Sequence, residues 1–396
     1  MKEVLETREI GGYDVAVCGG GIAGIAAALA AARHNARVLL IEKQYLLGGL
    51  ATSGLVTFYL PLCDGMGRQV SFGIAEELLR LSVKDGAENP VPRNWFYGEG
   101  GKTEKDKRFE TSFNAQVFAV LCEKLLLGAG VDVLYGDSVV GAKTNAGKLT
   151  HVIVEGKSGR RAYAVKSAVD ATGDCDLANL AGAKTNTYEQ GNVLAAWYYF
   201  AGKDGYKLKC LGSAEKPKAE QEEGYKLNML VNKRFKGVTS EELSEMTVLS
   251  HDASYNDWKA KRENDDSLWP VTFATIPLVR MTRKLVGERE MKNADDKVYM
   301  PDSVGMVSNW KTRGPVYEVP FGSLYSKSLK NVAVAGRCVS CTEQMWDVMR
   351  VIPCCAVTGQ AAGTAAAMSD DFGSLDISAL QSALKRDGVV LHEKDL

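Results

Sequence analysis

At the start of the chain, apolar runs alternate with a helical pattern of small residues. Residues 13–18 form a short apolar run, residues 22–34 are rich in Ala, and residues 38–43 form a second apolar run. Short apolar runs are typical of strands covered on both faces, as in parallel sheets. The order predicts a strand–helix–strand unit whose two strands lie parallel.

The alternation of strands and helices continues downstream. Glycines at 128 and 130 give a stop signal for the second of two expected helices, and a Gly-containing turn at 155–159 predicts a hairpin. We expect helices at 74–81 and 115–127, and strands at 131–135, 149–154, 162–169 and 329–335. These elements predict an α/β fold, with a Rossmann-like parallel sheet and a β-meander.

The character of the chain changes between residues 186 and 322. Residues 192–200 are dense in aromatic side chains and predict a buried strand, and further strand-like pieces follow at 271–277 and Leu285. A helix over 239–257 begins at a capping-box pattern, in which we expect Ser240 to pair with the N–H of Leu243. We therefore expect one domain from residues 1–185 and 323–396, and an inserted α+β domain from 186–322.

The loop after the first strand carries the motif G-x-G-x-x-G. Gly19 permits the tight turn, Gly21 lets backbone approach a pyrophosphate, and Gly24 lets helix and strand pack closely. The helix N-terminus adds free N–H groups and partial positive charge. Glu42, which ends the second strand, is placed to accept hydrogen bonds from a ribose diol. The whole pattern predicts a dinucleotide site, whereas a tight turn in an ordinary α/β protein leaves Glu42 unexplained.

Later segments favour FAD over NAD. The small-residue run at 47–54 can pass beside a flat ring, and the strand within 165–174 ends in a tight Gly-Asp turn. The last strand ends at Gly336, and a helix of small residues opens at Gly359. We expect the N-terminus of that helix to stabilise negative charge on a reduced flavin. A second G-x-G-x-x-G is missing, so a dedicated NAD(P)H domain is not expected.

With these motifs the chain resembles the FAD-dependent oxidoreductases of the glutathione-reductase-like fold, and within them the broad bacterial group described only as FAD-dependent oxidoreductases. The resemblance runs from about residue 13 to 370 and rests on the segments 19–24, 48–52, 67–78, 170–174, 280–288, 335–340, 350–353 and 359–363. It implies FAD as the cofactor and a substrate domain that caps the flavin. It does not identify the substrate, because the family is largely defined by its flavin site.

The expected cofactor contacts follow these motifs. The resemblance adds Val139, whose backbone would meet the adenine, and Arg350 is placed to contact the pyrophosphate or the N1/O2 edge of the flavin. The expected contacts are Gly19, Gly21, Ile22, Ala23, Gly24, Glu42, Lys43, Gly49, Leu50, Ala51, Thr52, Val139, Ala171, Thr172, Gly173, Gly336, Arg337, Arg350, Gly359, Ala361 and Ala362.

Candidates for catalysis lie mostly in the second domain. The resemblance makes Arg283, with Arg280, an anchor for a substrate carboxylate or carbonyl oxygen, and an inter-domain salt bridge is the alternative. Many family members carry an Asp-x-His-like element ahead of the last strand. This chain has Tyr317 in that stretch, so Tyr317 is the expected proton donor. His251 is a further candidate base, although surface histidines after helices are commoner.

Composition and cysteine usage exclude several classes of protein. A formal net charge of −1 offers no global attraction to nucleic acid or an anionic membrane. No His, Cys and carboxylate cluster has metal-ligand spacing, so no metal is expected. Residues 1–12 lack an apolar signal segment, and nine cysteines indicate free thiols in a reducing cytoplasm. Cys338 and Cys341 form a C-x-x-C, but disulfide oxidoreductases of this fold carry their redox pair after the first βαβ unit, so we expect no redox dithiol here.

These patterns predict a cytoplasmic FAD-dependent oxidoreductase. We expect it to transfer a hydride between flavin N5 and a small polar organic substrate, by alcohol or amine dehydrogenation or by reduction of an activated C=C bond. A flavin monooxygenase or halogenase is the alternative among enzymes, and a flavin-binding electron-transfer subunit is the alternative from another class. The direction of transfer, the electron acceptor and the oligomeric state stay open.

Overall fold

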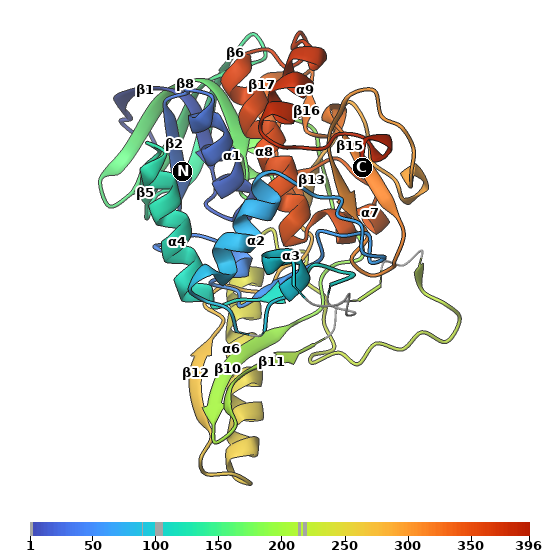
Figure 1. Cartoon of the computed structure of the whole chain (residues 1–396). Helices are drawn as coiled ribbons and strands as arrows, with labels where there is room; N and C mark the ends of the chain where they lie inside the picture. Colours follow the sequence, from blue (N-terminus) through green and yellow to red (C-terminus); the bar gives the residue numbers. More distant parts are fainter. Residues whose placement is uncertain (1–2, 89, 100–105, 213–214, 217–219) are drawn as a thin grey trace.

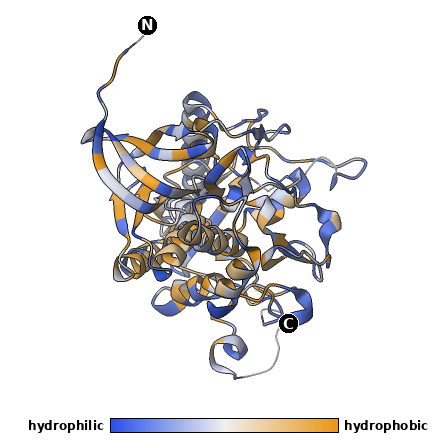
Figure 2. Ribbon diagram, turned by 90° about the horizontal axis from the view of Figure 1, so that it is seen from above, coloured by the Kyte–Doolittle hydropathy of each residue, from blue (hydrophilic) through white to orange (hydrophobic). Residues whose placement is uncertain are grey.

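The structure is a computed structural model that describes residues 3–88, 90–99, 106–212, 215–216 and 220–396. A body of sheet and helices forms the upper part of the molecule, and a narrow arm projects from it (Figure 1). In the view from above, apolar helices lie at the centre of the body and hydrophilic segments lie around its outside (Figure 2).

The body is built on a parallel sheet in the order β16-β17-β8-β1-β2-β5. Only β16 at the edge runs antiparallel on this path, and β6 and β7 form the predicted meander that leads into β8. The bounds are β1 Arg8–Cys18, β2 Val38–Glu42, β5 Asp132–Tyr135, β6 Ser138–Asn145, β7 Lys148–Gly156, β8 Gly159–Asp170, β16 Tyr325–Ser326 and β17 Leu329–Val334. The predicted Rossmann-like α/β class is confirmed.

Helix α1 (Ile22–Arg33) crosses α8 (Ile352–Met368) at very short range. A Cβ atom added at Gly359 would clash with the carbonyl oxygen of Ala23, and one at Gly363 would clash with that of Ala27. The two contacts are four residues apart on both helices, so they repeat along one face of each. Glycine is required here because no larger residue permits this approach of the backbones.

The other helices of the body surround this central pair. Asn114 caps α4 by accepting hydrogen bonds from the N–H groups of Gln116 and Val117, each at 3.1 Å. The remaining bounds are α2 Ile74–Lys84, α3 Arg93–Tyr97, α4 Ala115–Gly128, α5 Asp176–Leu180, α7 Glu343–Met349 and α9 Ile377–Arg386. Short strands β3 (Phe58–Tyr59) and β4 (Thr111–Ser112) pair beside α2.

The arm consists of a three-stranded antiparallel sheet and one long helix (Figure 1). The strands are β10 (Ala196–Gly202), β11 (Gly205–Leu211) and β12 (Trp269–Phe273), and β10 and β12 pack against the helix α6 (Ser240–Arg262). A small core of its own, with Leu194, Phe235, Met246 and Val279, lies at its base. The arm falls within the expected inserted domain.

The rest of the 186–322 segment packs on the body. Strand β13 (Arg283–Leu285) pairs with β9 (Thr185–Thr187), and β14 (Ser303–Ser308) pairs with β15 (Val316–Pro320). Val304, Val307 and Val319 belong to the same hydrophobic core as the parallel sheet. The contacts therefore assign β13 to β15 to the body, and the domain division at 186 and 322 stays a prediction.

Three local predictions are corrected. Helix α8 begins at Ile352 rather than at Gly359, because Pro353 in its first turn has no N–H that needs a partner. The N-cap of α6 is Thr239, whose side chain accepts from the N–H of Glu242 at 3.3 Å, and not Ser240. Strand β10 starts at Ala196 instead of residue 192, because Asn192 exchanges backbone hydrogen bonds with Phe235.

Within the described part of the chain, no single helix has both the length and the apolar content to cross a membrane. Helices α7 and α8 meet that test only when they are taken together, and they meet at 89°. Nearly every residue of α8 is buried in the body.

Candidate cofactor and substrate site

The glycine loop has the geometry of an anion site. Gly19 has a φ of +102°, and a Cβ there would lie 2.5 Å from the carbonyl oxygen of Ala171. A Cβ at Gly24 would clash with the carbonyl oxygen of Gly19, whereas a Cβ at Gly21 would meet nothing within 4 Å. No side chain caps α1 at its N-terminus, so its first N–H groups are available to phosphate oxygens. The loop thus fits a pyrophosphate beside Gly21.

Glu42 holds this loop in place from the end of β2. Its Oε2 accepts a hydrogen bond from the N–H of Gly20 at 2.6 Å, and its Oε1 accepts from the N–H of Gln44 at 2.8 Å. A carboxylate can accept more than two hydrogen bonds, so a ribose hydroxyl can still be received. The side chain is buried, whereas that of the next residue, Lys43, is exposed.

The segment after β2 folds back onto the glycine loop. The N–H of Gly48 donates to the carbonyl oxygen of Gly20 at 2.8 Å, and a Cβ at Gly49 would lie 3.3 Å from the Cα of Gly21. Leu50 and Ala51 continue the resulting turn, and Thr52 closes it by donating to the carbonyl oxygen of Leu47 at 2.5 Å. The structure thus brings together the two segments that the sequence assigned to the cofactor.

The turn after β8 is closed by Asp170. This side chain is fully buried and accepts hydrogen bonds from the N–H and Oγ1 of Thr172, at 3.1 and 2.7 Å, and from the N–H of Ala178 at 2.9 Å. Burial raises the pKa of Asp170 to about 6, although these hydrogen bonds oppose the rise. The turn positions Ala171 and Thr172 beside the glycine loop, and Gly173 lies against the guanidinium of Arg337.

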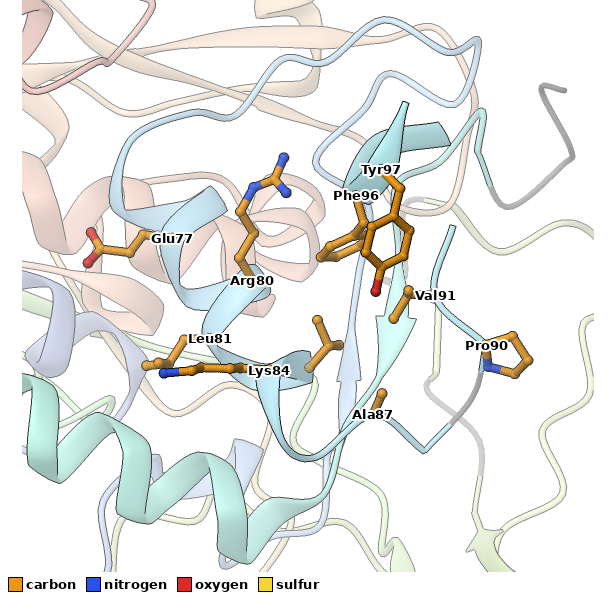
Figure 3. A pocket seen from close by; sticks show the side chains of 10 residues that line it. Glu77, Arg80, Leu81, Lys84, Ala87, Pro90, Val91, Phe96 and Tyr97 are labelled. Carbon is orange, nitrogen blue, oxygen red and sulfur yellow. The ribbon is translucent and has the colours of Figure 1, made fainter. Parts of the chain in front are cut away.

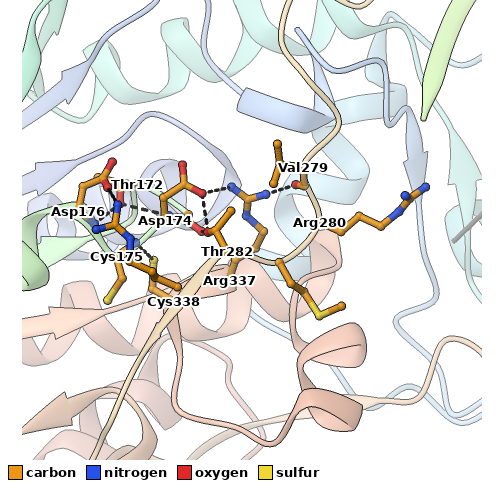
Figure 4. Close-up of polar contacts among 12 residues, drawn as sticks. Thr172, Asp174, Cys175, Asp176, Val279, Arg280, Thr282, Arg337 and Cys338 are labelled. Carbon is orange, nitrogen blue, oxygen red and sulfur yellow. Dashed lines mark hydrogen bonds and ion pairs between the residues drawn. The ribbon is translucent and has the colours of Figure 1, made fainter. Parts of the chain in front are cut away.

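Arg337 ties this turn to the segment that enters β13 (Figure 4). Its Nη2 donates to Oδ1 of Asp174 at 3.0 Å, and its Nη1 donates to the carbonyl oxygen of Val279. Thr282 donates to the same oxygen of Asp174 at 2.7 Å. The preceding residue, Gly336, is buried against Ala23 of α1. Arg337 therefore lies where the arm's base, the last strand and the turn after β8 meet.

The predicted anchor Arg283 forms an ion pair in the structure. Its Nη2 lies 2.6 Å from Oδ1 of Asp176, and its Nε is buried without a hydrogen-bond partner among the described residues. Burial raises the pKa of Asp176, and the positive charge of Arg283 opposes that rise. The structure thus shows the ion pair that the sequence left as the alternative, and the role of Arg283 in substrate binding stays a prediction.

A second group of charged side chains lies at the N-terminus of α8, which is the positive end of the helix dipole. Asp347 is buried; its Oδ1 accepts from Nε of Arg350 at 2.8 Å, and its Oδ2 pairs with Lys311. Burial by itself raises the pKa of Asp347, but the attraction of the two cations outweighs it and lowers the pKa overall. Because α8 begins two residues after Arg350, this group, and not Gly359, occupies the start of the helix.

Arg280 is the third cation of this region. Burial, together with the like charge of Arg350, lowers its pKa to about 10. In Figure 4 its side chain points away from Arg337 and Asp174. Its Nη1 is buried and has no hydrogen-bond partner in the described part of the chain.

Sequence reasoning missed a buried phenol and carboxyl at the base of the arm. The hydroxyl of Tyr199 lies 2.5 Å from Oγ1 of Thr57 and donates to Oε2 of Glu88 at 2.8 Å. Burial raises the pKa of both Tyr199 and Glu88. The sequence signal that could have revealed this contact is the alternation of side chains along β10. It places Tyr199 on the sheet face opposite Tyr198, and Tyr198 binds Asp257 of α6.

The structure places the remaining candidates as follows. Ala361 and Ala362 have fully buried side chains within α8, and Val139 is half-buried in β6. Tyr317 is buried in β15 within the main core, and burial raises its pKa. His251, on α6, lies 2.9 Å from the carbonyl oxygen of Ala274 through Nε2. The cofactor contacts and the proton donation expected of these residues stay predictions.

The C-x-x-C cysteines form no disulfide. Sγ of Cys338 accepts a hydrogen bond from the N–H of Cys175 at 3.1 Å, and the carbonyl oxygen of Cys341 accepts one from Lys284. All nine cysteines are free thiols, and burial raises the pKa of both Cys338 and Cys341.

A hollow of about 550 Å³ opens on the surface between α2 and α3 (Figure 3). Arg80 lies beside the ring of Phe96 in its wall, with Leu81 and Tyr97 nearby. None of its lining residues belongs to the expected cofactor or catalytic set.

The geometry defines an α/β protein with a Rossmann-type site for a dinucleotide, joined to a region of buried polar groups. The chain matches the family described as FAD dependent oxidoreductase over residues 14–196 and 203–384, and it belongs to that family. The protein is therefore an FAD-dependent oxidoreductase enzyme, which confirms the predicted cofactor and class.

Individual relatives are distant. The chain is 35% identical over 71 residues to thioredoxin reductase of Ureaplasma parvum serovar 3, a match that spans 18% of this chain and 23% of that protein. It is similar in structure to a geranylgeranyl bacteriochlorophyll reductase-like protein of Thermoplasma acidophilum, with a TM-score of 0.47, 14% identity, and coverage of 97% of this chain and 83% of the other. It is also similar in structure to p-nitrophenol 4-monooxygenase of Pseudomonas putida DLL-E4, with a TM-score of 0.49 and 11% identity. That match covers 97% of this chain and 82% of the other.

Proposed function

We propose that this FAD-dependent oxidoreductase dehydrogenates a small polar organic substrate at an alcohol or amine carbon. The supporting observation is the hydrogen-bonded group formed by Thr57, Tyr199 and Glu88 at the base of the arm. Leu55 belongs to the segment that follows the glycine loop, and it packs against Tyr199. The hydrogen-bonded group therefore lies next to that segment. Oε1 of Glu88 is buried and has no hydrogen-bond partner within the described residues. A buried acceptor of this kind is suited to receive a substrate O–H or N–H group.

The roles of the side chains follow from their protonation. When bound, the flavin supplies the two-electron chemistry, because its N5 accepts a hydride. The substrate loses a C–H hydrogen as hydride and the O–H or N–H hydrogen on the neighbouring atom as a proton. Glu88 takes that proton, and its raised pKa favours the protonated product. Tyr199 keeps its own proton at neutral pH because its pKa is raised, and it orients the carboxylate.

The test is anaerobic reduction of the flavin by a panel of alcohols, amines, and carboxylic acids that carry an alcohol or amine group. We expect one class to bleach the flavin, and we expect NADH and NADPH to bleach it slowly, since the chain has a single G-x-G-x-x-G. Fast, saturable bleaching by NADH with no response to the panel contradicts the proposal and favours a monooxygenase or halogenase. Reduction only by a protein donor favours an electron-transfer subunit.

Variants separate the proton acceptor from the fold. Glu88→Gln removes the acceptor at nearly constant size and should slow flavin reduction by about 10²- to 10⁴-fold. Tyr198→Phe is the matched control, because it also removes a tyrosine–carboxylate hydrogen bond but on the opposite face of β10. Equal rates in Glu88→Gln and the parent, at equal FAD content, remove Glu88 from the reaction.

A further inference from the structure

Helix α6 presents an exposed face on the side that lies away from the arm's sheet. Its buried positions are Met246, Ser250 and Ser254, which follow one another at intervals of four residues. On the opposite side, Val248 and Tyr255 are 66% and 49% exposed, and their spacing of seven residues keeps them on one line along the helix. Two large apolar side chains therefore stand in solvent on the outer face of the arm.

The apolar surface continues from α6 onto the neighbouring strand β12, which is an edge strand of the sheet. The ring of Tyr255 lies 5.9 Å from that of Trp258. The guanidinium of Arg262 lies over the rings of Trp258 and Trp269, at 5.4 and 4.3 Å from their centres. Trp269 and Val271 of β12 are themselves exposed. Exposed apolar groups that adjoin one another in this way mark interaction surfaces.

The outer face of α6 is acidic at one end and basic at the other. Glu241 and Glu245 lie in the first two turns of the helix, whereas Lys259 and Arg262 lie in its last turn. Alternating steps of four and three residues keep these side chains on one face. The face consists of Glu241, Glu245, Val248, Asp252, Tyr255, Lys259 and Arg262. A second helix with the same charges matches it only when the two helices run in opposite directions.

We propose that α6 pairs with α6 of a second copy of this chain in an antiparallel arrangement, about a two-fold axis near Asp252. The pairing places opposite charges at both ends of the contact and the exposed apolar side chains beside its centre. Opposite each other, in the two copies, lie Glu241 and Arg262, Glu245 and Lys259, and Val248 and Tyr255. A two-fold axis repeats each contact. Antiparallel helices also bring the positive end of each helix dipole beside the negative end of the other.

A copy of the chain is favoured over another protein because one sequence supplies both halves of the match. Helix α6 has 23 residues and, at about 1.5 Å per residue, is about 35 Å long. One helix pair of this length covers less surface than the roughly 800 Å² per partner of a stable complex. We therefore expect a reversible dimer, with a dissociation constant in the micromolar range. The pairing does not depend on which substrate the enzyme oxidises.

Sedimentation velocity of the full, FAD-loaded chain measures the pairing over a range of concentrations. We expect a monomer–dimer equilibrium that weakens with added salt, because salt screens exposed charges. Lys259→Glu and Glu245→Lys should each raise the dissociation constant about tenfold or more, since each places like charges together. Glu245 also forms an exposed ion pair with Lys233, so Lys233→Met, which breaks that pair alone, is the control for Glu245→Lys.

Two changes are expected to strengthen the pairing, a result that damage to the fold cannot give. In an equal mixture of Lys259→Glu and Glu245→Lys, every contact between positions 245 and 259 of two different variants joins opposite charges. Heterodimers should therefore form at least about tenfold more tightly than either variant pairs with itself. Asp252 lies on the axis, where the carboxylates of the two copies face each other. Asp252→Asn removes that repulsion and should lower the dissociation constant several-fold.

Variants of the apolar side chains complete the test. Tyr255→Ser and Val248→Ser should raise the dissociation constant about tenfold, because the contact loses apolar surface. Val120→Ser, at an exposed valine of α4 in the body, is the matched control and should leave it unchanged. A parent that stays monomeric at every concentration overturns the proposal and leaves a different protein as the occupant of this face. A dimer that no α6 variant weakens, or a mixture that forms no heterodimers, also overturns it.

Discussion

Oε2 of Glu88 lies 2.8 Å from the hydroxyl of Tyr199, although 111 residues separate the two in the chain. Glu88 belongs to the body, and Tyr199 belongs to the arm. Their hydrogen bond, together with that of Tyr199 to Thr57, fixes the arm's base against the segment that follows the glycine loop. The contact therefore joins the proposed chemistry to the attachment of the arm.

Gly21→Val should remove FAD and leave the fold intact. A Cβ atom added at Gly21 would meet no protein atom within 4 Å, so the substitution extends into the space assigned to the pyrophosphate. We expect loss of the yellow colour on gel filtration and an unchanged circular dichroism spectrum. Gly24→Val is the contrasting variant, because its Cβ would clash with the carbonyl oxygen of Gly19 and should impair folding. If Gly21→Val retains FAD on dilution as well as the parent, the loop does not bind the pyrophosphate.

Glu42→Ala should weaken FAD binding by roughly 1–3 kcal/mol, through the loss of charge-assisted hydrogen bonds. The structure adds a second reason, since the same carboxylate holds the N–H of Gly20 at 2.6 Å and orders the loop. Fluorescence titration of the apoprotein with FAD measures the dissociation constant. Titration with FMN separates the two effects, because FMN lacks the adenosine ribose. An equal loss for FMN and FAD means that Glu42 acts only on the loop.

Asp170 should make stability depend on acidity. Its folded pKa of about 6 lies above the ordinary value of 3.8, so between those values the folded protein binds the proton more tightly than the unfolded chain. The contribution of Asp170 to the free energy of unfolding is therefore fully present below about pH 4, and it is lost as the pH rises through about 6. At 1.36 kcal/mol per pKa unit, the change is about 3 kcal/mol at most.

Urea unfolding of the parent and of Asp170→Asn across pH 4 to 7 measures this effect. The difference between the two proteins should change over that range, because Asn does not titrate and all other groups are shared. A constant difference at matched FAD content would show that Asp170 has an ordinary pKa in the folded protein.

Arg283→Ala tests the predicted substrate anchor against the observed ion pair. Removing the guanidinium leaves Asp176 half-buried without its partner, so we expect the melting temperature to fall. If Arg283 also binds substrate, flavin reduction slows in samples matched for FAD. Asp176→Asn is the control, because it breaks the pair and keeps the cation. A lower melting temperature with unchanged reduction and substrate affinity leaves Arg283 a structural role.

The sequence by itself determined the parallel sheet, the glycine loop, Glu42 and the FAD family. Each of these depends on residues close together in the chain: spacing of glycines, runs of apolar residues, and an acid at a strand end. Such signals act through local backbone conformation and burial, which a short segment already specifies.

Only the tertiary structure decided which polar groups meet. The start of α8 at Ile352, the pairing of Arg283 with Asp176, and the contact of Tyr199 with Glu88 depend on how distant segments pack. The partners of Arg283 and Tyr199 lie more than a hundred residues away, and no local pattern reports such a distance. The sequence of an arginine's segment does not show whether its guanidinium is paired in the fold. Arg280 could therefore be distinguished from the ion-paired Arg283 only from the side chains that surround each of them. The physical reason is that burial and pairing are properties of the assembled core.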